Sequence, residues 1–193
     1  MLFDDLRAYL TEAGVVPEAD IRSVFEVGCS LGYLLRHLET GLFSGATTLE
    51  GIDIDRYAIE QGSTHLAAIG SKVRLEAADM GDLDSILAGR TFDVILCAGT
   101  LLYLPERDAR AVIHSILEHT GVVAVLAGLA HPDRDNSTLT ESTLRARDAT
   151  FIHDLDGMVR EADGRVVRRR WEGARMVDGN TLYFVFASPG RGR

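Results

Sequence analysis

The sequence predicts an α/β fold in which a seven-stranded, mostly parallel sheet carries helices on both faces. Hydrophobic runs alternate with amphipathic helical patterns from residue 22 to residue 128. The first run ends in a turn of small residues at 28–32, and a helical pattern follows directly. Two further strand patterns lie at 165–171 and 181–187. Such alternation is typical of parallel sheets, because each crossover helix covers a face of the sheet.

The expected elements follow in order from the amino terminus. Residues 2–13 form an amphipathic helix, because apolar side chains recur there at helical spacing until Gly14. The strands before the closing pair are expected at 22–28, 47–53, 72–76, 91–97 and 121–128. The later helices are expected at 32–40, 55–69, 82–88, 105–119 and 154–163. Asp178-Gly179 favours a hairpin turn between the last two strands.

The composition is that of a globular protein, with 46% hydrophobic and 25% charged residues in a chain of 193. We expect one domain, residues 1–193, with an amino-terminal helical segment at 1–20. No apolar run approaches the roughly 20 residues of a membrane span, and the acids in MLFDDLRAYL are not typical of a secretory signal. Two cysteines provide neither a disulfide framework nor a metal motif. We therefore expect no membrane association, no metal and a cytoplasmic location.

The net charge of −9 makes nucleic acid an unfavourable partner, because long-range electrostatics repel phosphate backbones. A local cluster of arginines near the carboxyl end is the exception to the acidic balance. We interpret this cluster as the solvated face of a strand, and its members are Arg165, Arg168, Arg169, Arg170 and Arg175.

The turn at 28–32 allows three interpretations. Gly28-Cys29-Ser30-Leu31-Gly32 matches the G-x-S-x-G pattern of a hydrolase nucleophile elbow, with Ser30 as the nucleophile. It also resembles a degraded dinucleotide-binding fingerprint in which Ser30 replaces the second glycine. From Glu26 to Gly32 it matches E-x-G-x-x-x-G, which resembles motif I of class I S-adenosylmethionine-dependent methyltransferases. Each interpretation places a ligand at the carboxyl end of the first strand, near backbone N–H groups and a helix start.

Downstream segments favour the third interpretation. LEGIDIDRYAIEQG at 49–62, VRLEAADMGDL at 73–83 and FDVILCAGTLLYLPE at 92–106 resemble the next three methyltransferase motifs in order and spacing. A hydrolase elbow is expected later in the sheet, and a plain dinucleotide-binding domain is expected to continue with a parallel strand. The resemblance covers residues 22–187. It implies a Rossmann-like class I methyltransferase fold with an antiparallel carboxyl-terminal strand.

The resemblance implies S-adenosyl-L-methionine as cofactor. Asp53 would accept the ribose hydroxyls, since an ionised carboxylate only accepts hydrogen bonds. Asp79 would accept from the adenine amino group, and Asp55 is interpreted as a helix N-cap. We interpret both cysteines as packing residues of the cofactor wall. The expected cofactor-binding residues are Glu26, Gly28, Cys29, Ser30, Gly32, Asp53, Ile54, Asp79, Met80, Cys97 and Ala98.

Methyl transfer is an in-line displacement, so alignment and exclusion of water can supply most of the catalysis. A base is needed only when the acceptor arrives protonated. His131 follows the fifth strand and is the candidate base, while Tyr103 is the candidate for positioning the methyl group. We expect the polar insertion at 131–152 to cover the substrate as a mobile, helix-containing lid.

Within the family, the small size and the L-L-Y-L stretch resemble nodulation-type N-methyltransferases and natural-product tailoring enzymes. We therefore expect a small-molecule acceptor, methylated at an amine or hydroxyl of a sugar, peptide or polyketide-like metabolite. The overall acidity favours a neutral or cationic acceptor. Methylation of RNA or protein, serine hydrolysis through Ser30, and a non-catalytic cofactor-binding module are the alternatives. The sequence does not indicate an oligomeric state.

Overall fold

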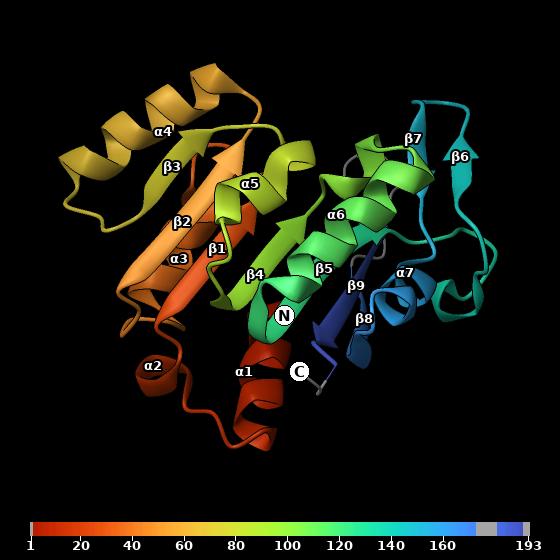
Figure 1. The fold of residues 1–193 in the computed structure, drawn as a ribbon, viewed down its shortest axis with the longest axis horizontal. Coiled ribbons are helices and arrows are strands. Elements are labelled where there is room, and N and C mark those ends of the chain that lie inside the picture. The colour runs from red at the N-terminus through yellow and green to blue at the C-terminus, as the bar shows by residue number, and fades with distance from the viewer. Residues whose placement is uncertain (1, 173–180, 191–193) are drawn as a thin grey trace. The chain divides into compact units, whose positions relative to one another are not determined.

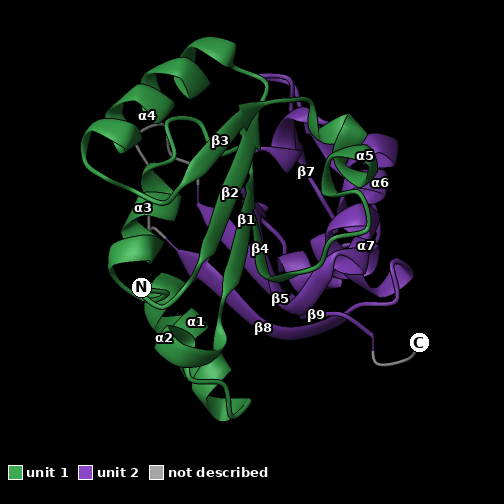
Figure 2. Ribbon diagram, turned by 60° about the vertical axis from the view of Figure 1, so that its left-hand side comes forward, with its two compact units in different colours: residues 1–96 green, residues 97–193 purple. Residues whose placement is uncertain are grey.

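The computed structural model describes residues 2–172 and 181–190, and it divides into two compact units, residues 1–96 and 97–193 (Figure 2). The strands of the main sheet follow the order β3-β2-β1-β4-β5-β9-β8 (Figure 1). Strand β9 runs antiparallel to both of its neighbours, β5 and β8, and the other strands are parallel. The α/β fold with an antiparallel carboxyl-terminal strand is therefore confirmed.

The element bounds agree with the sequence pattern to within two residues for the predicted strands. The main-sheet strands are β1 (Ser23–Val27), β2 (Thr48–Asp53), β3 (Arg74–Ala77), β4 (Phe92–Ala98), β5 (Thr120–Leu129), β8 (Arg165–Glu172) and β9 (Leu182–Ser188). The helices are α1 (Leu2–Glu12), α2 (Pro17–Asp20), α3 (Tyr33–Thr40), α4 (Arg56–Ala68), α5 (Leu83–Leu87), α6 (Glu106–Glu118) and α7 (Leu155–Glu161). The short helix α2 was not predicted. The predicted turn at Asp178-Gly179 and Arg175 lie outside the described residues.

In the unit of residues 1–96, parallel strands β1 and β2 are in a register that pairs Val27 with Ile52. Asp53 therefore lies one residue beyond the end of β1, at the carboxyl edge of the sheet. Figure 2 shows α3 and α4 on one face of these strands and α5 on the other. The apolar side chains of these strands are buried, which explains why hydrophobic runs in the sequence become strands here: Val24, Phe25 and Val27 of β1, and Leu49 and Ile52 of β2.

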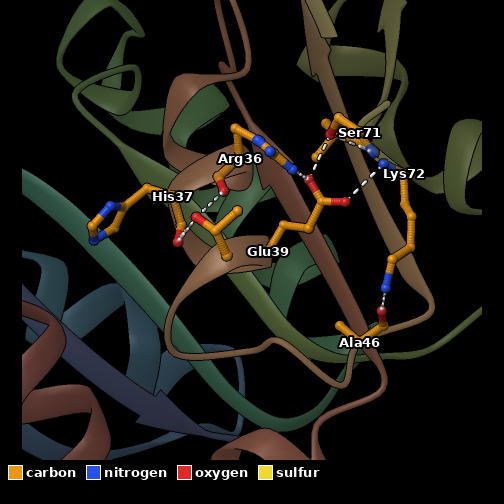
Figure 3. A network of polar contacts seen from close by, with 8 residues as sticks. Arg36, His37, Glu39, Ala46, Ser71 and Lys72 are labelled. Carbon is orange, nitrogen blue, oxygen red and sulfur yellow. Dashed lines mark hydrogen bonds and ion pairs between the residues drawn. The ribbon is translucent and has the colours of Figure 1, made fainter. Parts of the chain in front are cut away.

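Helix α3 is tied to the segment before β3 by the buried side chain of Glu39 (Figure 3). One Glu39 carboxylate oxygen accepts from the Arg36 guanidinium and the Ser71 hydroxyl, both at 2.6 Å. The other oxygen accepts from the Lys72 backbone N–H at 2.7 Å. The Lys72 ammonium in turn donates to the Ala46 carbonyl at 3.2 Å. These bonds fix the helix that follows the glycine turn.

In the unit of residues 97–193, α6 packs on β5, and α7 packs on β8 and β9. Between β5 and α7 lies the insertion, where the sequence predicted a helix-containing cover. Its helical part is one 3₁₀ turn, η3 (Asn136–Thr138), and the remainder forms an antiparallel pair, β6 (Thr143–Arg145) and β7 (Thr150–Ile152). The strand pair was not predicted, because each strand has only three residues. The described residues contain no helix long and apolar enough to cross a membrane.

Candidate functional site

The turn after β1 is fixed by bonds to the end of β2. The N–H groups of Gly28 and Cys29 both donate to the Ile52 carbonyl, at 2.8 and 2.9 Å. The Ser30 N–H donates to the Asp53 carboxylate at 2.8 Å. Backbone φ angles of 80° at Gly28 and 47° at Ser30 allow this path, which is uncommon for a serine. The sequence predicted that these N–H groups face a ligand. Instead, the Gly28 and Cys29 N–H groups bind the Ile52 carbonyl, and the Ser30 N–H orients the Asp53 side chain.

Two glycines outside the turn allow strand β2 and helix α4 to pack closely against it. A Cβ added at Gly51 of β2 would lie 2.7 Å from the Cys29 Cβ. A Cβ added at Gly62 of α4 would lie 2.6 Å from the Leu31 carbonyl oxygen. Both distances are shorter than real contacts of this kind, so only glycine fits at these positions. The turn is therefore held from β2 and from α4 in one conformation.

Glu26, the last acid of β1, is only 4% exposed, and its Oε2 has no hydrogen-bond partner among the described residues. Burial, reinforced by the nearby Asp53 charge, raises the pKa of the Glu26 carboxyl to about 8. A buried acceptor without a partner costs free energy, and such atoms concentrate where a ligand supplies the missing donor. Glu26 is therefore a candidate for binding a donor group of the ligand, and its cofactor role stays a prediction. Burial also raises the pKa of the Cys29 thiol, which keeps it protonated.

The other predicted acids occupy the expected places. Asp53 is half-buried and accepts from the Asp55 N–H at 2.9 Å through its second oxygen. Asp55 caps α4 by accepting from the Ala58 N–H at 3.1 Å, as predicted. Asp79 is exposed and accepts from the Gly81 N–H at 2.8 Å through Oδ1, at the start of η1 (Met80–Asp82). Its adenine-binding role stays a prediction.

Exposed apolar side chains follow two of these acids directly in the sequence. Ile54 is 73% exposed although it is a large aliphatic residue, and Met80 is half-exposed. Both side chains follow an acid at the carboxyl end of a strand, which is where the sequence predicted contact with the cofactor. Exposed apolar groups beside directed acceptors are what a ligand with a flat ring and hydroxyl groups requires.

The end of β4 belongs to the unit of residues 97–193. Cys97 is fully buried, and its Sγ lies 3.1 Å from the Thr100 hydroxyl, a contact that the sequence did not indicate. Ala98 follows it at the end of the strand. Tyr103, on the 3₁₀ turn η2 (Leu101–Tyr103), is 69% exposed, so its hydroxyl is accessible. Its role in positioning the methyl group stays a prediction.

The histidines of this unit differ in their surroundings. His153 is buried, its Nε2 lies 2.9 Å from the Leu101 carbonyl and its Nδ1 lies 2.8 Å from the Ser142 hydroxyl, so both ring nitrogens have structural partners. His131 is half-exposed, and its Nδ1 accepts from the Asp133 N–H at 3.0 Å. In the neutral ring this bond leaves the proton on Nε2. A base role for His131 stays a prediction, and it requires the ring to give up the bond to Asp133.

A buried asparagine that sequence reasoning missed holds the start of the insertion. Asn136 is fully buried, its amide donates to the Leu129 carbonyl at 3.1 Å, and its Oδ1 accepts from the His131 N–H at 2.9 Å. In the polar stretch HPDRDN an asparagine is indistinguishable from a solvated loop residue, so no signal in the sequence could have found it. This residue fixes where His131 lies relative to the end of β5.

A cavity of about 570 Å³ opens between the insertion and the last two strands of this unit. We call it the insertion cavity. Its lining residues are Ala130, His131, Pro132, Asp133, Thr143, Arg145, Ala146, Arg147, Ile152, Trp171 and Thr181. Its volume is that of a small-molecule site. The sequence identified His131 as a candidate here but missed the two arginines and Trp171, which lie far from it along the chain.

The family model for the methyltransferase domain matches residues 24–121, about half of the chain. The chain belongs to this family. The match begins in β1 and includes the turn, Asp53, Asp79 and the end of β4, which are the segments that carried the resemblance in the sequence. This membership agrees with the predicted enzyme class, an S-adenosylmethionine-dependent methyltransferase.

The individual proteins that are similar to this chain share 30% of its sequence or less. A carboxy-S-adenosyl-L-methionine synthase from Chromohalobacter salexigens is 30% identical over 150 residues, which cover 74% of this chain and 55% of that protein. The chain thus spans about half the length of this curated relative. Magnesium protoporphyrin IX methyltransferase from Synechocystis PCC 6803, solved with bound SAM, is 18% identical with a TM-score of 0.69, over 97% of this chain and 77% of that chain.

A glycopeptide N-methyltransferase, MtfA, is similar in structure, with 16% identity and a TM-score of 0.63 over 96% of this chain and 94% of that chain. At these identities the two solved structures show a shared fold. The residues of this chain fit the family's cofactor: Glu26 offers a buried acceptor without a partner, and Asp53 offers a half-buried carboxylate at the neighbouring strand end. S-Adenosyl-L-methionine carries the ammonium and the ribose hydroxyls that such acceptors bind.

Proposed function

We propose that this methyltransferase-domain protein transfers the methyl group of S-adenosyl-L-methionine to an amine or hydroxyl of a small metabolite. The unpartnered Glu26 oxygen beside Asp53, at the ends of two neighbouring parallel strands, carries the proposal. Carboxylates at this edge of an α/β sheet are where a nucleoside ligand is held. The insertion cavity supports the small-molecule part, because about 570 Å³ is too small for a folded macromolecule.

The proposed roles on the cofactor side follow from the contacts. Asp53 is held by the Ser30 and Asp55 N–H groups, so its two oxygens are oriented before the ribose arrives. Glu26 gives up its proton to accept from the cofactor's ammonium, because a cation beside the carboxyl favours its charged form. Ile54 and Met80 offer apolar surface to the adenine ring. When bound, S-adenosyl-L-methionine supplies an electrophilic methyl carbon on a sulfonium.

On the acceptor side, the nucleophile's lone pair forms a bond to the methyl carbon while the carbon–sulfur bond breaks. The acceptor then loses one proton to a base or to water. No residue of the chain has to become covalently modified, so alignment is the main contribution of the protein. Tyr103 is proposed to position the methyl group and His131 to take the proton.

The role of His131 is testable by kinetics. A general base typically contributes about 10²–10⁴-fold, so His131→Ala is expected to lower kcat by that factor and to remove the acidic limb of the pH–rate profile. Asn136→Ala provides a comparison in which His131 remains but loses a backbone partner. A loss of less than about threefold in His131→Ala would mean that alignment alone carries the reaction.

The other function classes are less well supported by the contacts. The family assignment does not support serine hydrolysis through Ser30, and the buried His153, which such a reaction could use as a base, has partners on both ring nitrogens. Methylation of RNA is disfavoured by the net charge of −9. The curated relative's name describes a synthase that makes a carboxylated form of the cofactor. The two activities can be told apart by their products, because only methyl transfer yields S-adenosylhomocysteine.

The test incubates the purified chain with methyl-labelled S-adenosyl-L-methionine and small-molecule extracts, and with bulk tRNA or rRNA in a parallel reaction. Mass spectrometry is expected to find S-adenosylhomocysteine as the product and the label in small molecules. Asp53→Ala serves as the cofactor-site control. Label in RNA exceeding that in small molecules would contradict the acceptor class. A cofactor of increased mass without S-adenosylhomocysteine would contradict methyl transfer itself.

A further inference from the structure

The turn η2, which carries Tyr103, is closed by the Leu101 carbonyl. This carbonyl accepts from the Leu104 N–H at 2.9 Å, and the Thr100 carbonyl accepts from the Tyr103 N–H at 3.1 Å. Leu101 is fully buried, whereas the Tyr103 side chain is 69% exposed. The position of the exposed ring therefore depends on how firmly the buried part of the turn is held.

His153, directly after β7, binds the same carbonyl from the side of the insertion. Its Nε2 lies 2.9 Å from the Leu101 oxygen, and a carbonyl only accepts, so this nitrogen carries a proton. Burial lowers the pKa of the His153 ring, which favours the neutral form, and its Nδ1 then accepts from the Ser142 hydroxyl at 2.8 Å. The ring also stacks on Phe151, with centroids 5.7 Å apart and planes 10° from parallel. These contacts hold the ring in one orientation.

Ser142 extends the contacts of His153 to the start of α6. Its backbone N–H donates to the carboxylate of Glu106, the first residue of that helix, at 3.1 Å. Ser142 and His153, which we call the clamp, thus hold the chain at Leu101 and again at Glu106. Tyr103 lies between these two points. The clamp therefore fixes the segment that carries Tyr103 from both sides.

Apolar packing joins η2 to the insertion as well. One buried cluster combines a leucine of η2, a leucine at the end of β5 and two residues of the insertion: Leu102, Leu129, Leu139 and Ile152. Ile152 directly precedes His153 and also lines the insertion cavity. A molecule in that cavity would thus lie against the residue next to the clamp.

We propose that the clamp sets the position of Tyr103 and that His153 is thereby a positioning residue for methyl transfer. The inference rests on the proposed function, in which Tyr103 positions the methyl group. Misplacement of a group by about 1 Å at the reacting atoms can lower a rate by about 10²-fold, so a contact that fixes the Tyr103 turn contributes to the rate. His153 needs no contact with the substrate, because it acts through the Leu101 carbonyl.

Two substitutions separate the two hydrogen bonds of His153. The amide of His153→Gln reaches the position of Nε2 and can still donate to Leu101, whereas the shorter amide of His153→Asn reaches only Ser142. Hydrogen exchange of the free protein is measured at the Tyr103 and Leu104 amides. His153→Asn is expected to speed this exchange by about tenfold, because the turn loses a buried hydrogen bond. His153→Gln is expected to stay within about threefold of wild type, because it keeps that bond.

A double-mutant cycle tests the role in catalysis. The rate of S-adenosylhomocysteine formation is measured with saturating S-adenosyl-L-methionine and a fixed amount of the small-molecule extract. His153→Asn is expected to lower this rate by about 10–100-fold in the wild-type background but by less than about twofold in the Tyr103→Ala background. His153→Gln is expected to restore most of the rate. A residue that only stabilises the fold would lower the rate by the same factor in both backgrounds.

His114→Asn is the matched control, because it changes a histidine of α6 whose side chain is 64% exposed. It is expected to leave both the exchange and the rate as in wild type. Circular dichroism checks that each variant is folded. If His153→Asn does not fold, Ser142→Ala replaces it in both measurements, since it removes the donor to Nδ1 and is expected to act in the same direction by a smaller factor.

Three results would overturn the inference and leave the proposed function standing. They are unchanged exchange at Tyr103 and Leu104 in folded His153→Asn, equal rate factors in the two backgrounds, and a His153→Gln variant as slow as His153→Asn. A wild-type chain that forms no S-adenosylhomocysteine would instead contradict the proposed function and, with it, the catalytic role of His153. The exchange data would then still decide whether the clamp holds the turn.

Discussion

Two buried glutamates in the unit of residues 1–96 have opposite surroundings. Glu39, at the end of α3, uses both carboxylate oxygens to bind Arg36, Ser71 and Lys72, and these donors keep its pKa below the ordinary value. Glu26, at the end of β1, has an oxygen without a partner, and burial raises its pKa to about 8. The first arrangement is complete in the free protein and stabilises the fold.

The second arrangement leaves the Oε2 atom of Glu26 without a donor, which is the difference expected between a structural carboxylate and one that binds a ligand. A fold selected only for stability has no reason to bury an acceptor unpaired, because removing the carboxyl would relieve the cost. A protein that binds a cationic ligand at that position gains binding free energy by keeping the carboxyl there. The contrast between Glu26 and Glu39 therefore leads to opposite expectations for stability, for pH dependence and for cofactor binding.

The largest expected effect is the pH dependence of stability at Glu26. Its folded-state pKa of about 8 lies above the ordinary 4.5, so the folded protein holds a proton that the unfolded chain releases. The stability from this group is complete below pH 4.5 and falls as the pH rises to about 8. Relative to Glu26→Gln, the wild-type free energy of unfolding is expected to fall by about 1.4 kcal/mol per pH unit in that window.

Urea titrations of both proteins between pH 5 and pH 9 would measure this slope. Parallel curves for wild type and Glu26→Gln would contradict the raised pKa. Because the bound cation favours the charged carboxyl, cofactor affinity of the wild-type chain is expected to rise across the same pH window.

Asp53→Ala is expected to have the next largest effect, on cofactor binding. Losing a hydrogen bond to a charged group costs about 1.5–3 kcal/mol, so the affinity for S-adenosyl-L-methionine should fall more than about tenfold. Asp55→Ala is the matched control, since it removes a carboxylate two residues away that caps α4. Calorimetry that finds the same affinity in Asp53→Ala as in wild type would remove Asp53 from the ribose role. NADH binding as tight as that of S-adenosyl-L-methionine would contradict the cofactor assignment.

Glu39→Gln is expected to destabilise the fold by about 1–3 kcal/mol at pH 7, because the Ser71 hydroxyl and the Lys72 N–H lose a charged, buried acceptor. The sign of the pH dependence is opposite to that at Glu26. The folded-state pKa of Glu39 is lowered, so its contribution is present above pH 4.5 and is lost as the pH falls. The exposed Glu60→Gln on α4 is the control. Equal free energies of unfolding for Glu39→Gln and Glu60→Gln would show that the hydrogen bonds of Glu39 do not stabilise the fold.

Tyr103→Ala is expected to have the smallest effect on stability, below about 0.5 kcal/mol, because the side chain is 69% exposed. A fall in kcat of this variant is then assignable to catalysis rather than to unfolding. Thermal unfolding and steady-state kinetics on the same preparation give both quantities. Unchanged kcat and KM would leave Tyr103 without the positioning role.

The sequence predicted the strands and the turn that carry the candidate cofactor residues well, because local patterns encode these elements. A hydrophobic run, a turn of small residues and an acid at the next strand end are contiguous signals, so Glu26, Gly28 and Asp53 could be named before the structure. The capping role of Asp55 follows from its position directly before a helix. What the sequence did not show is that the turn's N–H groups bond to Ile52 and Asp53, since both partners lie on another strand.

The insertion cavity depends on contacts between residues that are distant in the sequence. The insertion cavity brings Arg145 and Arg147 near Trp171 and Thr181 of the last two strands. Three-residue strands such as β6 and β7 carry no usable periodicity. The arginines of β8 were interpreted as a solvated face, yet Arg169 binds the fully buried Asp156. Such pairings are fixed by tertiary packing, which local patterns do not encode.

Hydrogen exchange with and without S-adenosylhomocysteine tests most directly that the Glu26 and Asp53 strand ends form the cofactor site. We expect the nucleoside to slow exchange in peptides covering residues 26–33 and 53–58. Peptides covering the Glu39 network at 36–40 and 71–73, whose hydrogen bonds are already complete, are expected to change little. Slowed exchange confined to residues 131–152, or no change at 26–33 at a saturating concentration, would contradict it.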